Sequence, residues 1–233
     1  MSALPERDSS PTSSDLAAPP RIVLFDFDGV LIRGDSYFEF MRARYLGSWW
    51  RPLLALLCLP WLLLMLPFSR ERVLRTLVHV ALLGVSKQRY QRLAGEFAAS
   101  LVRRSRPFCR EGLRALRAHQ AAGDRVVVVT GCEQTLVQAI FEELGLVPLE
   151  VLASQLRSGW SGMRLQRHNV GICKVQLLTQ SGITAWQVAY SDSLRDAPML
   201  KPAEQAVLVN ATPKLCKKVE HALGRAVARV QWY

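Results

Sequence analysis

The chain has 233 residues, half of them hydrophobic, and a formal net charge of +11. This length fits one α/β domain that carries an insertion. The positive charge favours an anionic partner, but no Lys- and Arg-rich block with interleaved aromatic residues occurs, so we expect no nucleic acid. The five cysteines lack C-x-x-C spacing, which indicates neither a zinc site nor a disulfide framework and fits a reducing, cytosolic setting.

Residues 1–20 are rich in Ser, Pro and Ala and lack apolar periodicity. No apolar core follows a basic start, so the segment does not have the pattern of a signal peptide. We predict a disordered tail.

An apolar run ends in two acids near the start of the chain. Ile22–Phe25 predicts a buried strand, and Asp26, Asp28 and Gly29 follow it. Ligands bind at this edge of open α/β sheets. One aspartate can then attack phosphorus and the other can move a proton, both beside a divalent cation. Two solvated acids at a strand end are the alternative for an isolated D-x-D.

The next polar residues precede a predicted helix. Asp35 or Ser36 can cap a helix that begins near Tyr37. Both residues also follow the catalytic strand closely, so Asp35 is a candidate for substrate recognition as well.

Residues 49–68 form an unusually apolar segment. No side chain from Pro52 to Phe68 is charged or strongly polar, but the run is shorter than the roughly 20 residues of a spanning helix, and Pro60 interrupts it. Arginines flank both ends, which favours both ends being cytoplasmic. Candidate catalytic residues lie before and after the run, so the chain must return to the side it left. We expect a re-entrant or in-plane helical hairpin on an anionic membrane surface.

The alternative for this segment is a very hydrophobic helix buried in the core of a cap. In either case residues 35–106 are predicted to be a helical cap insertion, with two amphipathic helices between residues 69 and 104.

The α/β pattern resumes at residue 107. Residues 125–129 predict a buried strand, followed by Thr130 and Gly131 and then by a helix from about Glu133. A hydroxyl and a glycine amide between a strand end and a helix N-terminus make an anion pocket. The alternative is that Thr130 only ends the strand or caps the helix.

Two later stations complete the pattern. Lys174 opens a predicted helix and can neutralise a phosphate together with the nucleophilic carboxylate, although a lone lysine is usually a surface residue. Asp192 and Asp196 follow the predicted strand 187–190 and suit Mg²⁺, with an acidic helix start as the alternative. With further strands at 151–156, 206–209 and 228–230, we predict a Rossmann-like parallel sheet with helices on both faces, built from residues 21–34 and 107–233.

The words DFDGV, VVVVTG, GICK and YSDSLRD occur in this order. With them the chain resembles the haloacid dehalogenase superfamily of aspartate-nucleophile phosphatases, and its insertion looks like the cap of the phosphoserine-phosphatase-like branch. Within that branch, LASQL, a glycine-rich turn and the proline-interrupted apolar insertion resemble the phosphatidylglycerophosphatase C family of bacterial membrane enzymes. One departure is Arg195, which stands where the superfamily commonly has a small polar residue before the last acid, and it affects the geometry expected of the metal shell.

The resemblance implies a role for each station. Asp26 attacks phosphorus and binds Mg²⁺, while Asp28 protonates the leaving alcohol and later activates water, with its backbone carbonyl facing the metal. Lys174 supplies charge. The other implied residues are Thr130 and Gly131, which would hold the transferring oxygens, Asp192 as a metal ligand, and Asp196 as a ligand through water or as the group that orients Lys174. Gly29 and Asp35, beside the strand end, are further candidates for substrate binding.

These residues predict a Mg²⁺-dependent phosphomonoesterase that forms an aspartyl-phosphate. We expect it on the cytoplasmic face of the inner membrane, with a lipid head group such as phosphatidylglycerophosphate as its substrate. One alternative is a phosphatase of a small soluble ester, such as a phosphorylated amino acid or sugar. Another, motivated by Arg195 and the apolar insertion, is a catalytically silent membrane-associated interaction protein.

Overall fold

The structure is a computed structural model that describes residues 20–104 and 107–233, so nearly all of the predicted tail lies outside the described residues. Its centre is a sheet of seven strands in the order β4-β3-β2-β1-β5-β6-β7. All neighbours run parallel except β3 and β4, which form an antiparallel hairpin. The strands are β1 Ile22–Phe25, β2 Arg125–Glu133, β3 Glu150–Gly159, β4 Gly162–Arg167, β5 Val188–Ser191, β6 Gln205–Val209 and β7 Ala228–Val230.

The strand order places the first acid pair at the centre of the sheet. β1 lies between β2 and β5, and the chain order reverses there. In open parallel sheets this switch point, at the carboxyl ends of the strands, is where ligands bind. The predicted parallel sheet is confirmed, and the predicted turn at 159–162 is the tip of the β3–β4 hairpin.

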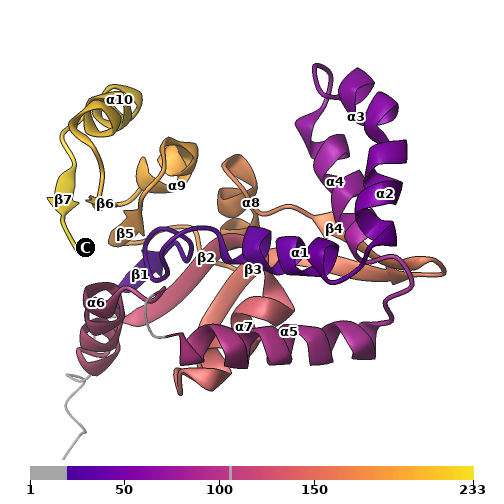
Figure 1. Ribbon diagram of the computed structural model, residues 1–233. Helices are drawn as coiled ribbons and strands as arrows, with labels where there is room; N and C mark the ends of the chain where they lie inside the picture. Colours follow the sequence, from indigo (N-terminus) through magenta and orange to yellow (C-terminus); the bar gives the residue numbers. More distant parts are fainter. Residues whose placement is uncertain (1–19, 105–106) are drawn as a thin grey trace, which may run out of the picture.

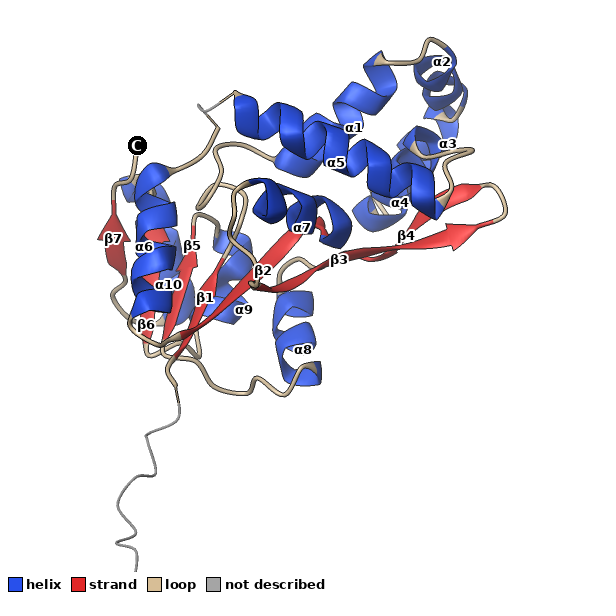
Figure 2. Cartoon of the chain, turned by 90° about the horizontal axis from the view of Figure 1, so that it is seen from below, coloured by secondary structure: helices blue, strands red, loops and turns tan. Residues whose placement is uncertain are grey.

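Helices cover both faces of the sheet because the strand residues alternate in direction. Val23 and Phe25 face one apolar cluster, whereas Leu24 faces a second one on the other side. Figure 1 shows α5, α6 and α7 on one side of the sheet and α8, α9 and α10 on the other, and Figure 2 views the molecule from the side of the first three. These helices are α5 Lys87–Arg103, α6 Arg110–Ala121, α7 Gln134–Glu143, α8 Ile172–Gln180, α9 Ala197–Leu200 and α10 Pro213–Leu223.

Strand β2 is longer than predicted. We expected it to end at Val129, but it continues through Thr130 to Glu133, and its register against β3 shifts on the way. Two side-chain hydrogen bonds accompany this irregularity. The Thr130 hydroxyl accepts the N–H of Cys132, and the Ser154 hydroxyl donates to the carbonyl of Gly131. The prediction that Thr130 and Gly131 lie between strand and helix is therefore wrong, because a distorted strand continues through them.

The insertion is helical, as predicted. It contains α1 Ser36–Leu46, α2 Trp50–Leu57, α3 Leu59–Met65, α4 Arg70–Ala81 and α5. Phe40 of α1 and Tyr90 of α5 belong to the same apolar cluster as Phe141 of α7. Helices α1 and α5 of the insertion therefore share a core with α7, which covers one face of the sheet. The division into core and cap stays a prediction.

The apolar segment forms the two short helices α2 and α3, which meet at Cys58. Figure 1 shows them beside α4, standing away from the sheet. The alternative of a buried cap helix is wrong, because Leu56, Leu57 and Leu63 are 60%, 71% and 60% exposed. In the described ranges, no helix combines the length and apolar character that crossing a membrane requires.

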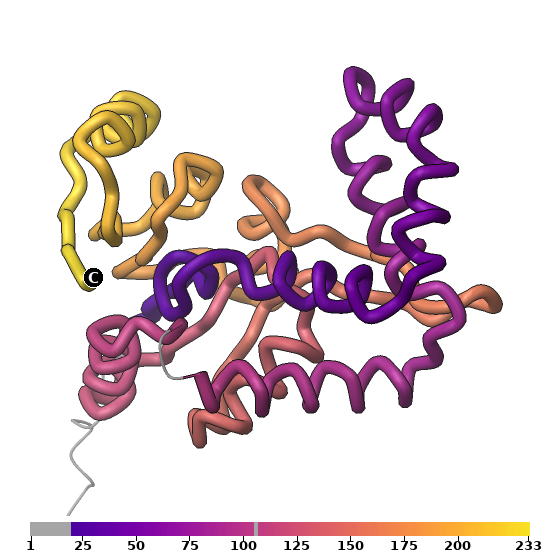
Figure 3. Tube along the Cα trace, viewed as in Figure 1, coloured from indigo at the N-terminus to yellow at the C-terminus, as the bar shows by residue number. Residues whose placement is uncertain are grey.

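The residues after β7 return to the loop after β1. The Asn210 side-chain oxygen accepts the backbone N–H groups of Trp232 and Tyr233. The Tyr233 hydroxyl then donates to the Gly29 carbonyl at 3.1 Å, and the Arg33 guanidinium lies over its ring. Figure 3 shows this end of the chain beside the indigo segment that contains β1.

Candidate active site

Asp26 forms a buried ion pair at the end of β1. Its backbone N–H continues the ladder to Tyr190 of β5, and its side chain is 8% exposed. The Lys174 ammonium lies 3.0 Å from Asp26 Oδ1 and 2.8 Å from Asp196 Oδ2. Lys174 is only 2% exposed, so the alternative of a surface lysine is wrong. The structure thus brings three predicted residues into one cluster.

Two elements hold this cluster in place. Gly171, at φ +60°, precedes α8 and turns the chain so that Lys174 lies in the first turn of that helix. Asp196 ends the short 3₁₀ helix η1 (Leu194–Asp196), and its Oδ2 also accepts the Ser191 hydroxyl at 2.7 Å. Asp196 therefore binds side chains, rather than only complementing a helix end.

The charges of the cluster are coupled. Burial raises the pKa of Asp26 well above its usual range; Lys174 opposes this effect and Asp196 adds to it. Burial also disfavours ionised Asp196, but Lys174 and the hydrogen bonds outweigh it and lower the pKa of that group. The two carboxylates raise the pKa of Lys174 against the effect of burial. The lysine cation and the Asp196 anion thus form the fixed pair, and Asp26 is the group whose charge responds to its surroundings.

Asp28 is poised to exchange a proton near neutrality. Its Oδ1 accepts the backbone N–H of Ser36 at 2.9 Å and the Ser36 hydroxyl at 2.7 Å. Burial raises the pKa of Asp28 to about 7, although these hydrogen bonds work in the opposite direction. A carboxyl group of this kind can protonate a leaving oxygen and then accept a proton from water.

Gly29 and Asp35 stand around this acid. Gly29 has φ +79°, and a Cβ at this position would overlap the carboxylate of Asp192, so both the backbone and the packing exclude a larger residue. Asp35 accepts the N–H of Phe38 at 2.8 Å, which confirms the capping role, and it also lines the cavity described below.

The donor set fits a hard cation. Within the described ranges, no three acid, His or Cys side chains are grouped as a ready metal cluster, and Lys174 already bridges two of the acids. Mg²⁺ commonly uses only one or two protein carboxylates and keeps several waters. Asp26 and Asp192 are near enough for the charge of Asp192 to raise the pKa of Asp26, which supplies such a pair. The magnesium site stays a prediction.

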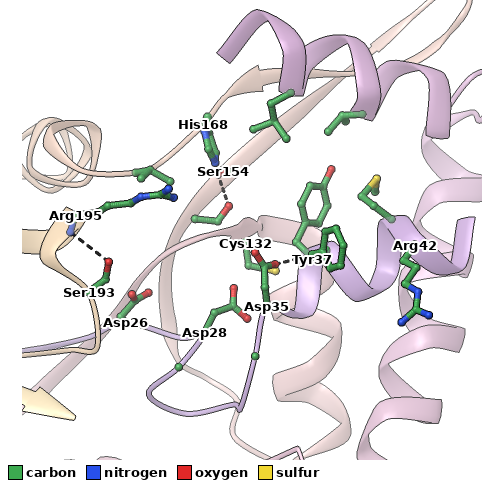
Figure 4. A pocket seen from close by; sticks show the side chains of 18 of the residues that line it. Asp26, Asp28, Asp35, Tyr37, Arg42, Cys132, Ser154, His168, Ser193 and Arg195 are labelled. Carbon is green, nitrogen blue, oxygen red and sulfur yellow. Dashed lines mark hydrogen bonds between the residues drawn. The ribbon is translucent and has the colours of Figure 1, made fainter. Parts of the chain in front are cut away.

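These residues line a cavity of about 960 Å³ (Figure 4). Its polar end contains Asp26, Asp28, Lys174 and Asp192. Apolar side chains from α1, α4 and β4 form much of its wall, and Arg42 of α1 also lines it. These apolar residues are Tyr37, Phe38, Met41, Tyr45, Leu46, Leu74, Leu77, Val78 and Leu165. Other lining residues include Gly131, Cys132, Ser154, His168 and Arg195.

The structure does not bring Thr130 to this cavity. Its side chain is fully buried and is engaged with the Cys132 amide, whereas its neighbour Gly131 does line the cavity. The role of Thr130 as a phosphate ligand stays a prediction.

Sequence reasoning missed the apolar wall. Its signal was present in the spacing of Leu74, Leu77 and Val78, but that periodicity predicted only packing within the insertion. It also missed the hydrogen bond from Ser36 to Asp28, because nothing in the sequence distinguishes a helix-capping serine from one that turns toward a catalytic acid.

A model of the haloacid dehalogenase-like hydrolases matches residues 23–201. The chain therefore belongs to this family and is a hydrolase.

Solved structures share its fold. A protein of unknown function from Bordetella pertussis Tohama I is 21% identical with a TM-score of 0.69, covering 90% of this chain and 99% of its own. A substrate-bound phosphoserine phosphatase complex is 17% identical with a TM-score of 0.55, and the match covers 91% of this chain and 93% of that one. A phosphoserine phosphohydrolase-like protein from Francisella tularensis is 14% identical with a TM-score of 0.59, covering 90% and 94%. The fold is that of the phosphoserine-phosphatase-like branch.

Proposed function

We propose that this hydrolase is a Mg²⁺-dependent phosphomonoesterase that removes phosphate from a lipid head group, such as that of phosphatidylglycerophosphate, at the cytoplasmic face of the inner membrane. One observation carries the proposal. A single cavity joins the buried acids Asp26 and Asp28 to an apolar wall built from α1 and α4. Such a cavity suits a substrate with a phosphate at one end and a hydrocarbon chain close to it.

The residues divide the chemistry between them. A carboxylate oxygen of Asp26 attacks phosphorus while the ester oxygen leaves with the proton of Asp28, giving an aspartyl-phosphate. Asp28, now ionised, takes a proton from a water molecule that attacks the phosphorus, and Asp26 is released. Lys174 stabilises charge on the transferring oxygens. A bound Mg²⁺, held by Asp26, Asp192 and the Asp28 carbonyl, would add further charge neutralisation.

The membrane part of the proposal is supported by the apolar helices α2 and α3. They pack against α4, the helix that also supplies Leu74 and Leu77 to the cavity wall. The two helices expose leucines and Trp61, and arginines precede and follow them, so apolar and anionic components of a membrane surface would both be matched.

Phosphate release tests the assignment. We expect purified protein with Mg²⁺ to dephosphorylate phosphatidylglycerophosphate in vesicles faster than phosphoserine or sugar phosphates, and Asp26→Asn to release no phosphate above background. Turnover by Asp26→Asn equal to that of the unaltered protein would refute the nucleophile. A preference for the soluble esters would refute the lipid substrate.

A small soluble phosphomonoester is the second candidate. It is favoured by the fold shared with proteins named as phosphoserine phosphatases, whose substrate is small. Vesicle flotation separates the two candidates, because a protein that stays in the aqueous fraction even with acidic lipids present would favour the soluble ester. Hydrolysis of any generic aryl phosphate would exclude the catalytically silent interaction protein.

A further inference from the structure

Arg44 and Arg51 lie together near the start of α2 without an ion-pair partner in the described part of the chain, and the charge of Arg89 acts on both. Arg44 lies near the end of α1, Arg51 in the first turn of α2, and Arg89 in the first turn of α5. None of the three forms an ion pair with any residue in the described part of the chain. Arg44 and Arg51 are absent from the lining of the catalytic cavity, so the cluster is a separate feature.

Two of these side chains have unused donors. Arg51 is 7% exposed, Arg44 is partly buried and Arg89 is exposed, and the Nε–H groups of Arg44 and Arg51 are buried without a hydrogen-bond partner. The only bond that joins the pair is a long one of 3.4 Å, from Arg51 Nη1 to the Arg44 carbonyl. The ring of Trp50 lies over the Arg51 guanidinium and compensates for part of its lost hydration.

The arginines also act on one another. Burial lowers the pKa of Arg51, and the nearby charge of Arg89 lowers it further. The pKa of Arg44 is lowered by burial and by both other arginines, with weak opposition from Glu96. A buried cation without an ion-pair partner is costly, whereas a bound anion would satisfy the charges and the unused donors together.

We propose that Arg44, Arg51 and Arg89 bind the phosphate group of an anionic phospholipid near the start of α2. The planar, forked guanidinium is suited to phosphate oxygens. A phosphate held there would have its acyl chains beside the exposed leucines Leu53, Leu56 and Leu57 of α2. The inference rests on the proposed membrane location but not on the catalytic chemistry, because it uses none of the acids.

Vesicle binding by the full chain tests the site. The probes are phosphatidylcholine vesicles with and without phosphatidylglycerol, and the variants are Arg51→Gln and Arg44→Gln. We expect each variant to bind the anionic vesicles at least about tenfold more weakly, the equivalent of one charge-assisted hydrogen bond. Arg72→Gln is the matched control: it removes the same charge from an exposed position on the neighbouring helix α4, and we expect a loss of about fivefold or less.

Melting temperature distinguishes a binding role from a structural one. We expect the melting temperature of Arg51→Gln in solution not to fall, because removing the unpaired charge offsets the loss of the contacts with Trp50 and the Arg44 carbonyl. A clear decrease would show that these structural contacts outweigh the cost of the charge and would overturn the inference. A folded Arg44→Gln that binds anionic vesicles as tightly as Arg72→Gln would overturn it as well. Glycerol phosphate, at matched ionic strength, tests the lipid source. If it abolishes the difference between Arg51→Gln and the unaltered protein, the site takes free phosphate and the lipid assignment is wrong.

The outcome is separable from that of the proposed function. Asp26→Asn should bind anionic vesicles as the unaltered protein does, because its loss concerns catalysis alone. Hydrolysis by the unaltered protein without a specific effect of Arg51→Gln on binding would refute this inference only, whereas selective binding without any phosphate release would refute the phosphatase only.

Discussion

Asp192 packs against the α-carbon of Gly29, so that the loop after β1 and the loop after β5 share one surface with no room for a side chain between them. The contact couples two loops that are distant in sequence, each carrying acids of the site. The glycine after the two acids is therefore required by its neighbour as well as by its own positive φ.

The first prediction concerns this contact. Gly29→Ala should reduce kcat/KM at least about tenfold, because the new methyl group displaces Asp192 and the left-handed backbone adds about 1–2 kcal/mol of strain. Gly123→Ala is the matched control, since Gly123 has φ +82° with no atom near the added Cβ. The control should lose stability in urea unfolding but keep its activity. Equal kinetics for the two variants would show that the Gly29–Asp192 contact does not matter.

The second prediction is a pH dependence. The pKa of Asp28 is raised to about 7, and the proposed first step uses its protonated form. Because kcat/KM reports on the steps up to formation of the aspartyl-phosphate, it should fall as the pH rises above about 7. Asp28→Asn should lose about a hundredfold or more in activity, and its residual activity should lack this decline. An unchanged alkaline limb in the variant would assign the limb to another group.

The same carboxyl group also makes the stability of the protein depend on pH. The folded state holds the Asp28 proton up to about pH 7, whereas the unfolded chain releases it near the usual 3.8, so this group's contribution to stability decreases as the pH rises through that window. Asp28→Asn should therefore melt at a higher temperature than the unaltered protein at pH 8, and the difference should shrink toward pH 4. A melting temperature that is lower for the variant at every pH would contradict the assigned pKa shift.

The third residue to test is Lys174. Lys174→Met leaves the buried Asp196 carboxylate without its cationic partner, which should cost about 3–5 kcal/mol in the free energy of unfolding at neutral pH. The loss should diminish at acid pH, because protonation of Asp196 removes the unpaired charge. Denaturant unfolding at two pH values provides the measurement, and Lys201→Met, an exposed position, is the control. Equal losses in the two variants would mean that the pair contributes nothing specific.

The apolar wall gives the last prediction. Leu77→Gln should shift the ratio of kcat/KM for a long-chain lipid phosphate over an aryl phosphate by about tenfold, since the hydrocarbon chain would lose an apolar contact. Leu63 is an exposed residue of α3 that does not line the cavity. Leu63→Gln should therefore leave this ratio unchanged for detergent-dispersed substrate. A ratio that is the same in both variants would argue against the wall as the site of the chain.

Much of the fold follows from local patterns in the sequence. Alternating and continuous apolar runs predicted most of the strands, and the order of the acid-bearing words predicted which ends meet. β2 could not be predicted to its end, because the bonds of Thr130 and Ser154 that accompany its distortion depend on a strand that comes later in the chain.

The residues that converge were predictable, but the contacts between them only in part. Asp26, Lys174 and Asp196 come together as their motifs indicate, and of the two roles expected for Asp196 the structure shows the contact with Lys174. The composition of residues 49–68 predicted an apolar segment. Which of its leucines stay exposed depends on how α2 and α3 pack against α4. Nothing in the sequence indicates that Arg51 is buried, because it is one of several arginines that flank the apolar segment.

The bracing of the catalytic loop from the far edge of the sheet has a consequence for heat sensitivity. Tyr233 reaches Gly29 only because the three-residue edge strand β7 and Asn210 hold the segment between them. Short edge strands fray at lower free energy than the centre of a sheet. On warming, we therefore expect the protein to lose activity while most of its secondary structure is still intact, because β7 separates from the edge of the sheet first.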